Sequence, residues 1–221
     1  SPGSAPPVRA PAPPRRTPNA APGAPIRRTF PTGSEWLYAK LYTGTATADR
    51  LLVDLVAPLV ADVLGSGSAD RWFFLRYADP DWHLRLRFSG SPEALRDGVL
   101  PRLLSAVAPL IAQGLVWRLQ LDTYEREVER FGGPAGMELS ERIFHADSDA
   151  ALGIVGLWLG EAGADVRWRL ALRGMELLLD DLGLGAGPKR EIVESARRSF
   201  ADEFGATPHS FAARYRAEAT A

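Results

Sequence analysis

The chain has 221 residues, of which 46% are hydrophobic, and its formal net charge is −1. This length suffices for one domain with a sizeable core, while the balanced charge provides no global attraction to nucleic acid or to anionic membranes. The absence of cysteine excludes disulfides, thiolate catalysis and cysteine zinc sites, and with only three histidines a multi-histidine metal site is not expected.

The first segment, residues 1–33, consists mainly of Pro, Ala, Gly, Ser and Arg and has almost no aliphatic side chains to bury. This composition predicts a disordered leader or linker and places the folded domain at residues 34–221. The segment lacks the apolar core of a signal peptide, and no stretch of the chain approaches the ~20 apolar residues of a membrane span. We therefore expect a cytoplasmic protein without a membrane partner, and the start at Ser1 without methionine suggests a piece of a longer chain.

A strand and a helix are predicted next. Residues 36–42 alternate at period two, which predicts a strand with one face formed by Trp36, Tyr38, Lys40 and Tyr42. Apolar residues then recur at helical spacing over residues 51–64, which predicts an amphipathic helix. Because proline lacks the amide hydrogen that a helix interior requires, we expect a kink at Pro58.

Residues 72–88 carry two alternating apolar runs around a turn and predict a β-hairpin with a cationic face. Period-two alternation sends His83, Arg85 and Arg87 to one side of the second strand. If the loop has four residues, Arg76 lies opposite His83 and joins that side. Such a surface requires an anion, a carboxylate partner or water to receive its charge.

The remaining segments complete the fold prediction. A Ser-Pro-Glu start at Ser91 predicts a helix as far as Ala112, and alternation over 116–124 predicts a fourth strand. The later segments are predicted to be helical over 137–146, 147–160, 165–182, 188–204 and 208–219. Early strands and late helices predict an α+β fold, in which a small, mainly antiparallel sheet from the N-terminal half packs against a helical C-terminal half.

A run of mixed charge, residues 125–130, follows the fourth predicted strand and ends near Gly132 and Gly133. In a helical turn, Glu127 and Arg130 stand three residues apart on one face, close enough for the carboxylate to orient the guanidinium. From composition alone, a solvated charge run is the simpler interpretation.

Four segments, taken together in order and spacing, resemble a known family. They are WLYAKLY (36–42), WFFLRYADPDWHLRLRF (72–88), TYEREVERFGG (123–133) and ERIFHADSDAA (141–151). They resemble the C-terminal domain of class I lanthipeptide dehydratases, which also occurs alone in thiopeptide-type bacteriocin biosynthesis. The resemblance covers residues 35–205.

The resemblance implies a lyase of peptide antibiotic biosynthesis. It would eliminate glutamate from glutamylated Ser or Thr of a ribosomal precursor peptide, leaving dehydroalanine or dehydrobutyrine, and would need no cofactor. The implied partners are the precursor peptide with its leader and a glutamyl-tRNA-dependent glutamylation domain or protein. A homodimer is a further expectation, and direct contact with nucleic acid is not expected.

The resemblance also implies roles for particular residues. The departing glutamate carries two carboxylates, which guanidinium forks match in a bidentate way. The functional arginines of the family map to the His-Leu-Arg-Leu-Arg strand and to the Glu-Arg turn, so Arg87 and Arg130 are the candidate catalytic arginines. Arg85 is the alternative equivalent on the strand. Glu127 would hold Arg130 or join the proton transfer.

The base is less directly indicated. We expect His83 to be this base, because neighbouring arginine charge would keep it neutral. The candidate substrate-binding residues are Arg85, Arg76, Tyr124 and Lys40. Family members that eliminate glutamate resemble one another in a further histidine near the chain end, within a His-Met and Asn-Arg pattern that this sequence lacks. Either truncation or divergence explains that difference.

Two other functions stay open at this point. A divergent branch resembling this fold performs the [4+2] cycloaddition of two dehydroalanines that forms the thiopeptide pyridine and releases the leader. In that reaction Tyr77, Tyr124 and Glu127 would matter more than an arginine pair. The non-enzymatic alternative is an inactive module that binds leader peptide at a sheet edge.

Overall fold

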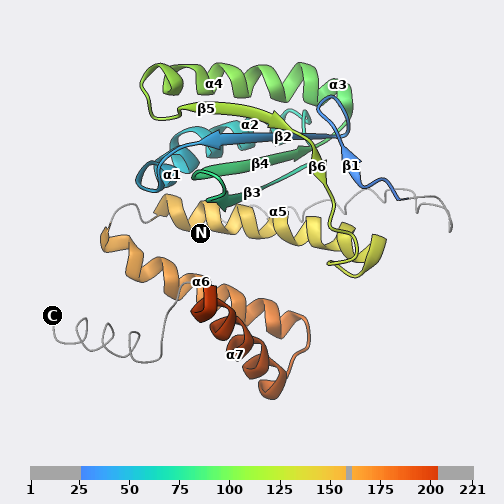
Figure 1. The fold of residues 1–221 in the computed structure, drawn as a ribbon, viewed down its shortest axis with the longest axis vertical. Helices are drawn as coiled ribbons and strands as arrows, with labels where there is room; N and C mark the ends of the chain where they lie inside the picture. Colours follow the sequence, from blue (N-terminus) through green and yellow to red (C-terminus); the bar gives the residue numbers. More distant parts are fainter. Residues whose placement is uncertain (1–25, 158–160, 204–221) are drawn as a thin grey trace, which may run out of the picture.

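A four-stranded antiparallel sheet forms the centre of the protein, in the strand order β3-β4-β2-β5 (Figure 1). The computed structural model describes residues 26–157 and 161–203. The sheet contains β2 (Trp36–Tyr42), β3 (Arg71–Tyr77), β4 (His83–Ser89) and β5 (Arg118–Asp122). The predicted α+β class is confirmed, since the sheet comes from the N-terminal half and packs against helices.

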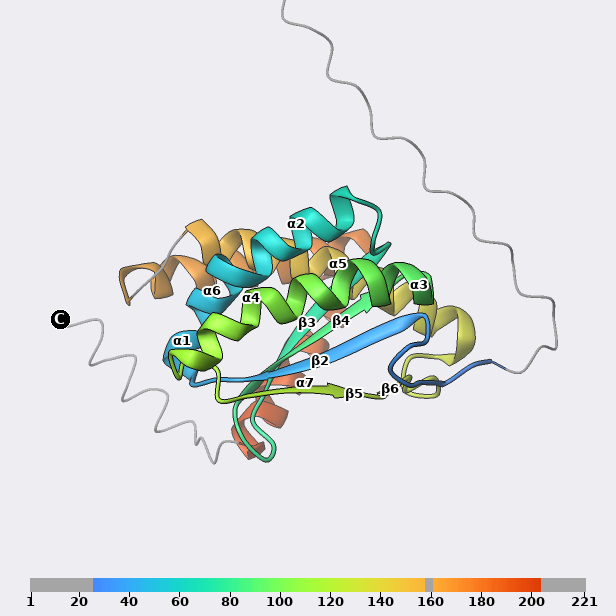
Figure 2. The ribbon, with the colours of Figure 1, turned by 90° about the horizontal axis from the view of Figure 1, so that it is seen from above.

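Two broken helices cover one face of the sheet (Figure 2). The first runs through α1 (Thr45–Leu51), the π-helical η1 (Leu52–Val56) and α2 (Ala57–Gly65), and the second through α3 (Pro92–Ala94), the π-helical η2 (Leu95–Val99) and α4 (Leu100–Ala112). In both, a proline is the second residue after the π-helical segment, Pro58 in α2 and Pro101 in α4. Because proline has no N–H to donate, a change of hydrogen-bond register is tolerated there. The expected disruption at Pro58 therefore takes the form of a π-helical segment.

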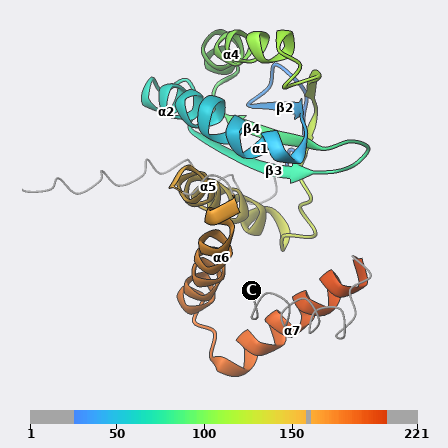
Figure 3. The same ribbon diagram turned by 90° about the vertical axis from the view of Figure 1, so that its left-hand side faces the viewer.

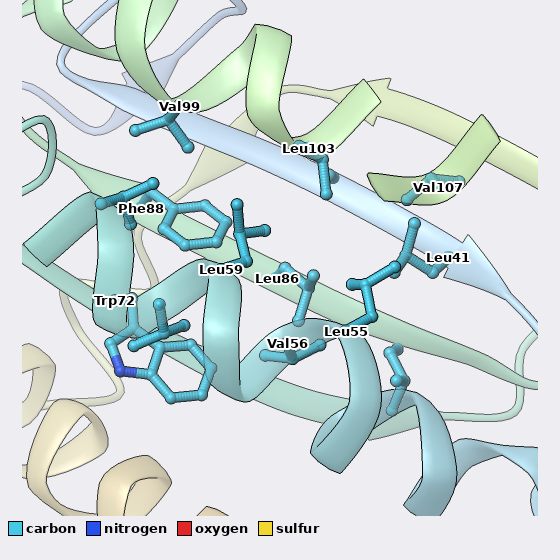
Figure 4. Packing of buried hydrophobic residues seen from close by; sticks show 14 of the residues in the cluster. Leu41, Leu55, Val56, Leu59, Trp72, Leu86, Phe88, Val99, Leu103 and Val107 are labelled. Atoms are coloured by element: carbon cyan, nitrogen blue, oxygen red, sulfur yellow. The ribbon is translucent and has the colours of Figure 1, made fainter. Parts of the chain in front are cut away.

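The main core lies between these helices and the sheet (Figure 4). Alternate strand residues point toward the helices, among them Leu41, Trp72, Leu86 and Phe88, all buried. They meet a helical stripe formed by Leu55, Val56, Leu59, Val99, Leu103 and Val107. Full burial of one such side chain stabilises the fold by about 1.5–3 kcal/mol. This face of the sheet therefore serves to stabilise the fold.

Three long helices follow the sheet, α5 (Gly133–Leu157), α6 (Glu161–Asp181) and α7 (Ala186–Glu203). They lie below the sheet in Figure 3. The helices predicted over 137–146 and 147–160 are one continuous helix, α5, as far as the structure describes them. The helix predicted over 208–219 lies outside the described residues. No helix in the described ranges has the length and apolar character needed to cross a membrane.

Helix α5 covers the edge of the sheet formed by β3, and this explains why it is not divided at residue 147, where the sequence predicts a new helix. Ser148 Oγ accepts a hydrogen bond from the Phe74 amide at 3.1 Å, and His145 Nδ1 lies 3.1 Å from the Trp72 carbonyl oxygen. Asp149 Oδ1 accepts from the Trp72 indole at 2.7 Å. Ser148 and His145 thus pair with backbone N–H and C=O groups of the edge strand β3 that would otherwise lack hydrogen-bond partners.

The predicted four-residue hairpin loop is wrong. Strand β3 ends at Tyr77, which pairs with His83, so the loop holds the five residues 78–82. A shift of one residue moves a side chain to the other face of a sheet. Arg76 therefore lies on the helix-covered face, where its Nη2 donates to Asp49 of α1 at 2.6 Å, and Tyr77 takes its place beside His83.

The predicted boundary at residue 33 is also too late. Thr29 and Phe30 form β1, which pairs with β6 (Tyr124–Glu125) in a two-stranded sheet. Phe30 is buried and its ring stacks on that of Tyr124. Such long-range pairing of one apolar residue is invisible in a composition dominated by proline and alanine. The part of the predicted leader before residue 26 lies outside the described residues.

Candidate functional site

The face of the sheet opposite the helices α1 to α4, here called the open face, carries the candidate residues. Strand register arranges its side chains in rows that cross the sheet. From β5 to β3 the rows are Arg118–Tyr42–His83–Tyr77, then Gln120–Lys40–Arg85–Leu75, then Asp122–Tyr38–Arg87–Phe73. Four of the predicted residues, Lys40, His83, Arg85 and Arg87, are thus brought together. Cations and aromatic rings alternate along this surface.

Arg87 is held by aromatic rings and has no acidic partner in the described part of the chain. Its Cζ lies 4.5 Å from the ring centroid of Tyr124, 4.6 Å from Tyr38 and 5.2 Å from Phe73. Its Nε is buried and makes no hydrogen bond. Burial lowers the pKa of Arg87, but guanidinium groups keep their charge in proteins. The arrangement leaves a cation with an unused N–H, which suits a carboxylate ligand.

Arg85 is held by a histidine and a tyrosine ring. Its Nε donates to His83 Nε2 at 3.0 Å, and its Cζ lies 3.5 Å from the Tyr77 ring centroid. His83 Nδ1 lies 2.7 Å from the carbonyl oxygen of Asp81, which assigns the proton to Nδ1 and the lone pair to Nε2. Burial, and then the positive charges of Arg85 and Lys40, lower the pKa of His83 and keep it neutral.

Two further cations of the open face already have partners. Lys40 Nζ forms an ion pair with Asp122, which neutralises much of its charge. Although burial alone would raise it, the pKa of Asp122 is lowered by Lys40. Arg118 stacks on Tyr42 with its Cζ 3.6 Å from the ring centroid. The cations free to receive a ligand are therefore Arg85 and Arg87 more than Lys40.

Tyr124 belongs to β6 rather than to the four-stranded sheet, and its ring packs against Trp36 and Phe73 on the open-face side of that sheet. It is 3% exposed, and its hydroxyl donates to Glu141 Oε1 at 3.0 Å. Burial and the Glu141 carboxylate raise the pKa of Tyr124, so the phenol keeps its proton. Arg126 forms a bidentate pair with the same carboxylate, both distances being 2.6 Å. Tyr124 thus touches Arg87 with its ring only.

The sequence interpretation missed Glu141 and Arg126. Both stand in the quoted segments 141–151 and 123–133, but the sequence gives no signal that joins them across fourteen intervening residues. Arg126 alternates with glutamates in a run that looks solvated, and Glu141 precedes an arginine on an ordinary amphipathic helix. No group of three His, Cys, Asp or Glu side chains suited to a metal occurs within residues 26–157 and 161–203.

The predicted pairing of Glu127 with Arg130 is confirmed. Arg130 Nη1 donates to Glu127 Oε2 at 2.7 Å, in a turn that ends at Gly132 and Gly133 with φ values of 79° and 90°. Those left-handed values favour glycine. Both charged side chains are exposed, at 72% and 59%. No hydrogen bond or ion pair connects Arg130 to the open face within the described ranges, but Arg130 interacts electrostatically with Tyr77 of that face, whose ring contacts Arg85.

Comparisons with known proteins agree with the resemblance. The family described as "Lantibiotic biosynthesis dehydratase C-term" matches residues 36–221. Subtilin biosynthesis protein SpaB of Bacillus subtilis is 36% identical over 130 residues, which cover 59% of this chain and 12% of that protein. Nisin biosynthesis protein NisB of Lactococcus lactis subsp. lactis is 36% identical over 115 residues, covering 52% of this chain and 11% of that protein.

A solved structure adds support for the fold. The crystal structure of the tRNA dependent lantibiotic dehydratase MibB from Microbispora sp. 107891 is 40% identical, with a TM-score of 0.52, over 56% of this chain and 12% of that chain. The chain therefore matches about one eighth of the length of these relatives.

Proposed function

The chain belongs to the family of lantibiotic dehydratase C-terminal domains, and on that premise we propose that it eliminates glutamate from glutamylated Ser or Thr of a precursor peptide. In this reaction a base takes the proton from Cα of the modified residue. The electron pair forms the Cα–Cβ double bond, the Cβ–O bond breaks, and glutamate departs as a carboxylate. The peptide is left with dehydroalanine or dehydrobutyrine. An earlier glutamylation step is required, which we assign to a partner domain or protein.

The observation that carries this proposal is the guanidinium of Arg87, which has no acidic partner in the described part of the chain. A mostly buried cation among Tyr38, Phe73 and Tyr124 lacks the carboxylate that such a group normally finds inside a protein. Departing glutamate supplies one. Because negative charge grows on the leaving oxygen as the Cβ–O bond breaks, a fixed guanidinium stabilises the transition state more than the ground state.

His83 is our candidate for the Cα proton. Neutral His83 holds its lone pair on Nε2, where Arg85 now donates. When Arg85 turns to a second ligand carboxylate, that lone pair becomes available. Ligand binding and base release are coupled in this proposal, and no cofactor is required.

The test uses the complete chain and a synthetic peptide whose serine is esterified by glutamate. We expect release of glutamate together with a dehydroalanine peptide, identified by mass spectrometry and by its addition of a thiol. Hydrolysis would release glutamate too, but it would regenerate serine. Arg87→Lys keeps a positive charge and loses the planar fork, so we expect its rate of elimination to fall by about 100-fold.

Arg102→Lys is the matched control, because Arg102 pairs with Asp62 on the opposite, helical face. Its rate should equal that of the unmodified chain. Unchanged elimination in Arg87→Lys would refute the assignment of Arg87, and serine as the only product would refute elimination itself.

A further inference from the structure

Glu141 is a buried carboxylate of α5 that pairs with Tyr124 and Arg126, and the chemistry above does not use it. The residue is 0% exposed. Arg126 donates to both of its oxygens at 2.6 Å, and the Tyr124 hydroxyl donates to Oε1 at 3.0 Å. Apolar side chains in place of a buried ion pair are often neutral or stabilising. Stability alone is therefore a weak reason for this pair.

Tyr124 links this pair to Arg87. At one end its hydroxyl is fixed by Glu141, and its ring lies edge-on to Trp36 with a centroid distance of 4.9 Å. On its other side the ring centroid is 4.5 Å from the Arg87 Cζ. The Arg87 Nε has no hydrogen bond, and the ring contacts with Tyr38, Phe73 and Tyr124 contribute to holding this guanidinium in place. The position of the Tyr124 ring therefore contributes to the position of Arg87.

Arg126 has a separate effect in this arrangement. Because it occupies both oxygens of Glu141, the carboxylate is neutralised locally. Glu141 can then orient Tyr124 without pairing with Arg87. Arg87 is thus held in position while its positive charge stays available for a ligand. A preorganised binding group requires both properties.

We propose that Glu141, neutralised by Arg126, is a positioning residue that holds the Tyr124 ring against Arg87 and so preorganises Arg87 for a carboxylate. The inference rests on the proposed function only in naming glutamate as the source of that carboxylate. The placement of Arg87 itself can be measured without any reaction.

Two measurements on the complete chain test the proposal. The first is the NMR signal of the Arg87 Nε–H, identified by its loss in Arg87→Lys. The second is the Kd for L-glutamate from calorimetry. Tyr124→Phe keeps the ring and removes only the hydroxyl bond to Glu141, so we expect a displaced Arg87 signal and a Kd raised about fivefold.

A double variant removes the buried pair while keeping the interior apolar and filled. Arg126→Met combined with Glu141→Leu should fold, shift the Arg87 signal, and raise the glutamate Kd by about tenfold or more. Glu138→Gln is the matched control, since Glu138 lies on the same helix and pairs with Arg142 at the surface. It should change neither measurement.

The outcomes separate this proposal from the proposed function. If Tyr124→Phe and the folded double variant leave the Arg87 signal and the Kd unchanged, Glu141 does not position Arg87. Should the double variant fail to fold, Tyr124→Phe decides alone. If the variants shift the Arg87 signal while the unmodified chain binds no glutamate, the positioning stands and the glutamate assignment is lost.

Discussion

Individual side chains of the open face differ in what holds their charge. Arg85 is held by a neutral acceptor, Arg87 by aromatic rings, and Lys40 by a carboxylate. Only the last of these arrangements neutralises a cation. The alternation of the sequence predicted the shared face of His83, Arg85 and Arg87, because period two is a property of any strand. It could not predict which cations have partners, since these come from other elements.

The state of His83 makes the site sensitive to pH. Burial first, and then the charges of Arg85 and other cations, lower the pKa of His83 below its usual value of about 6.5. Protonation would place a hydrogen on Nε2, release Arg85 from His83 and add a positive charge beside the site for the ligand carboxylates. We therefore expect glutamate binding to strengthen as the pH falls from about 8 to about 5.5, a range in which the ligand carboxylates stay ionised.

The same shift also acts on stability. The unfolded chain takes up the proton of His83 at higher pH than the folded chain, so the free energy of unfolding should decline as the pH drops below about 6.5. His83→Gln retains an acceptor that does not titrate. Calorimetric titrations across this range should show a flatter dependence of Kd on pH for His83→Gln. An equal slope in both proteins would show that another group is responsible.

At the scale of the helices and strands, some parts of the fold could be predicted from local sequence patterns and others could not. The strands at 36–42 and 72–88 follow from alternation and were predicted closely. The hairpin loop was missed by one residue, because the Arg76 side chain gains an ion pair with Asp49 that lies on another element. The continuity of α5 was missed for a similar reason. The sequence predicts a new helix from residue 147, yet Ser148 lies within one continuous helix and accepts a hydrogen bond from β3.

This edge contact provides a prediction for α5. Ser148 is 2% exposed, and Ser148→Ala leaves the Phe74 amide without its acceptor. An unsatisfied buried donor costs about 1–3 kcal/mol, so the free energy of unfolding in urea should fall by that amount. Ser105→Ala, at an exposed position of α4, makes the same chemical change and should be neutral or slightly stabilising. Equal stability of the two variants would mean that the edge of β3 is satisfied in another way.

At the scale of the whole molecule, the two faces and the β3 edge of the sheet have different roles in the described chain. One face of the sheet is filled by the core under α1 to α4, the edge at β3 is sealed by α5, and the open face keeps its cations. Helices α6 and α7 differ from these layers. They expose large apolar side chains, including Leu172, Met175, Leu178, Ile192 and Val193. An ion pair between Arg167 of α6 and Asp49 of α1 connects α6 to these layers.

Asp49 is the centre of that connection. One carboxylate oxygen accepts from Arg76 of β3 at 2.6 Å and the other from Arg167 of α6 at 2.5 Å. Although burial alone would raise it, the pKa of Asp49 is lowered by these two arginines. A carboxyl group with a depressed pKa stabilises the fold above its unfolded pKa, and this stabilisation is lost as the pH falls through the folded value.

Asp49→Asn should therefore loosen α6 without unfolding the sheet. We expect faster backbone hydrogen exchange over α6 and α7 at neutral pH, while the amides of β2 and β4 keep their protection. Asp54→Asn is the matched control, because Asp54 lies in the same broken helix and forms an exposed pair with Arg50 at 3.7 Å. Acidification of the unmodified chain below the usual aspartate pKa of about 3.9 should reproduce the change in α6. If Asp49→Asn exchanges at the rate of Asp54→Asn, α6 is held by contacts other than this carboxylate.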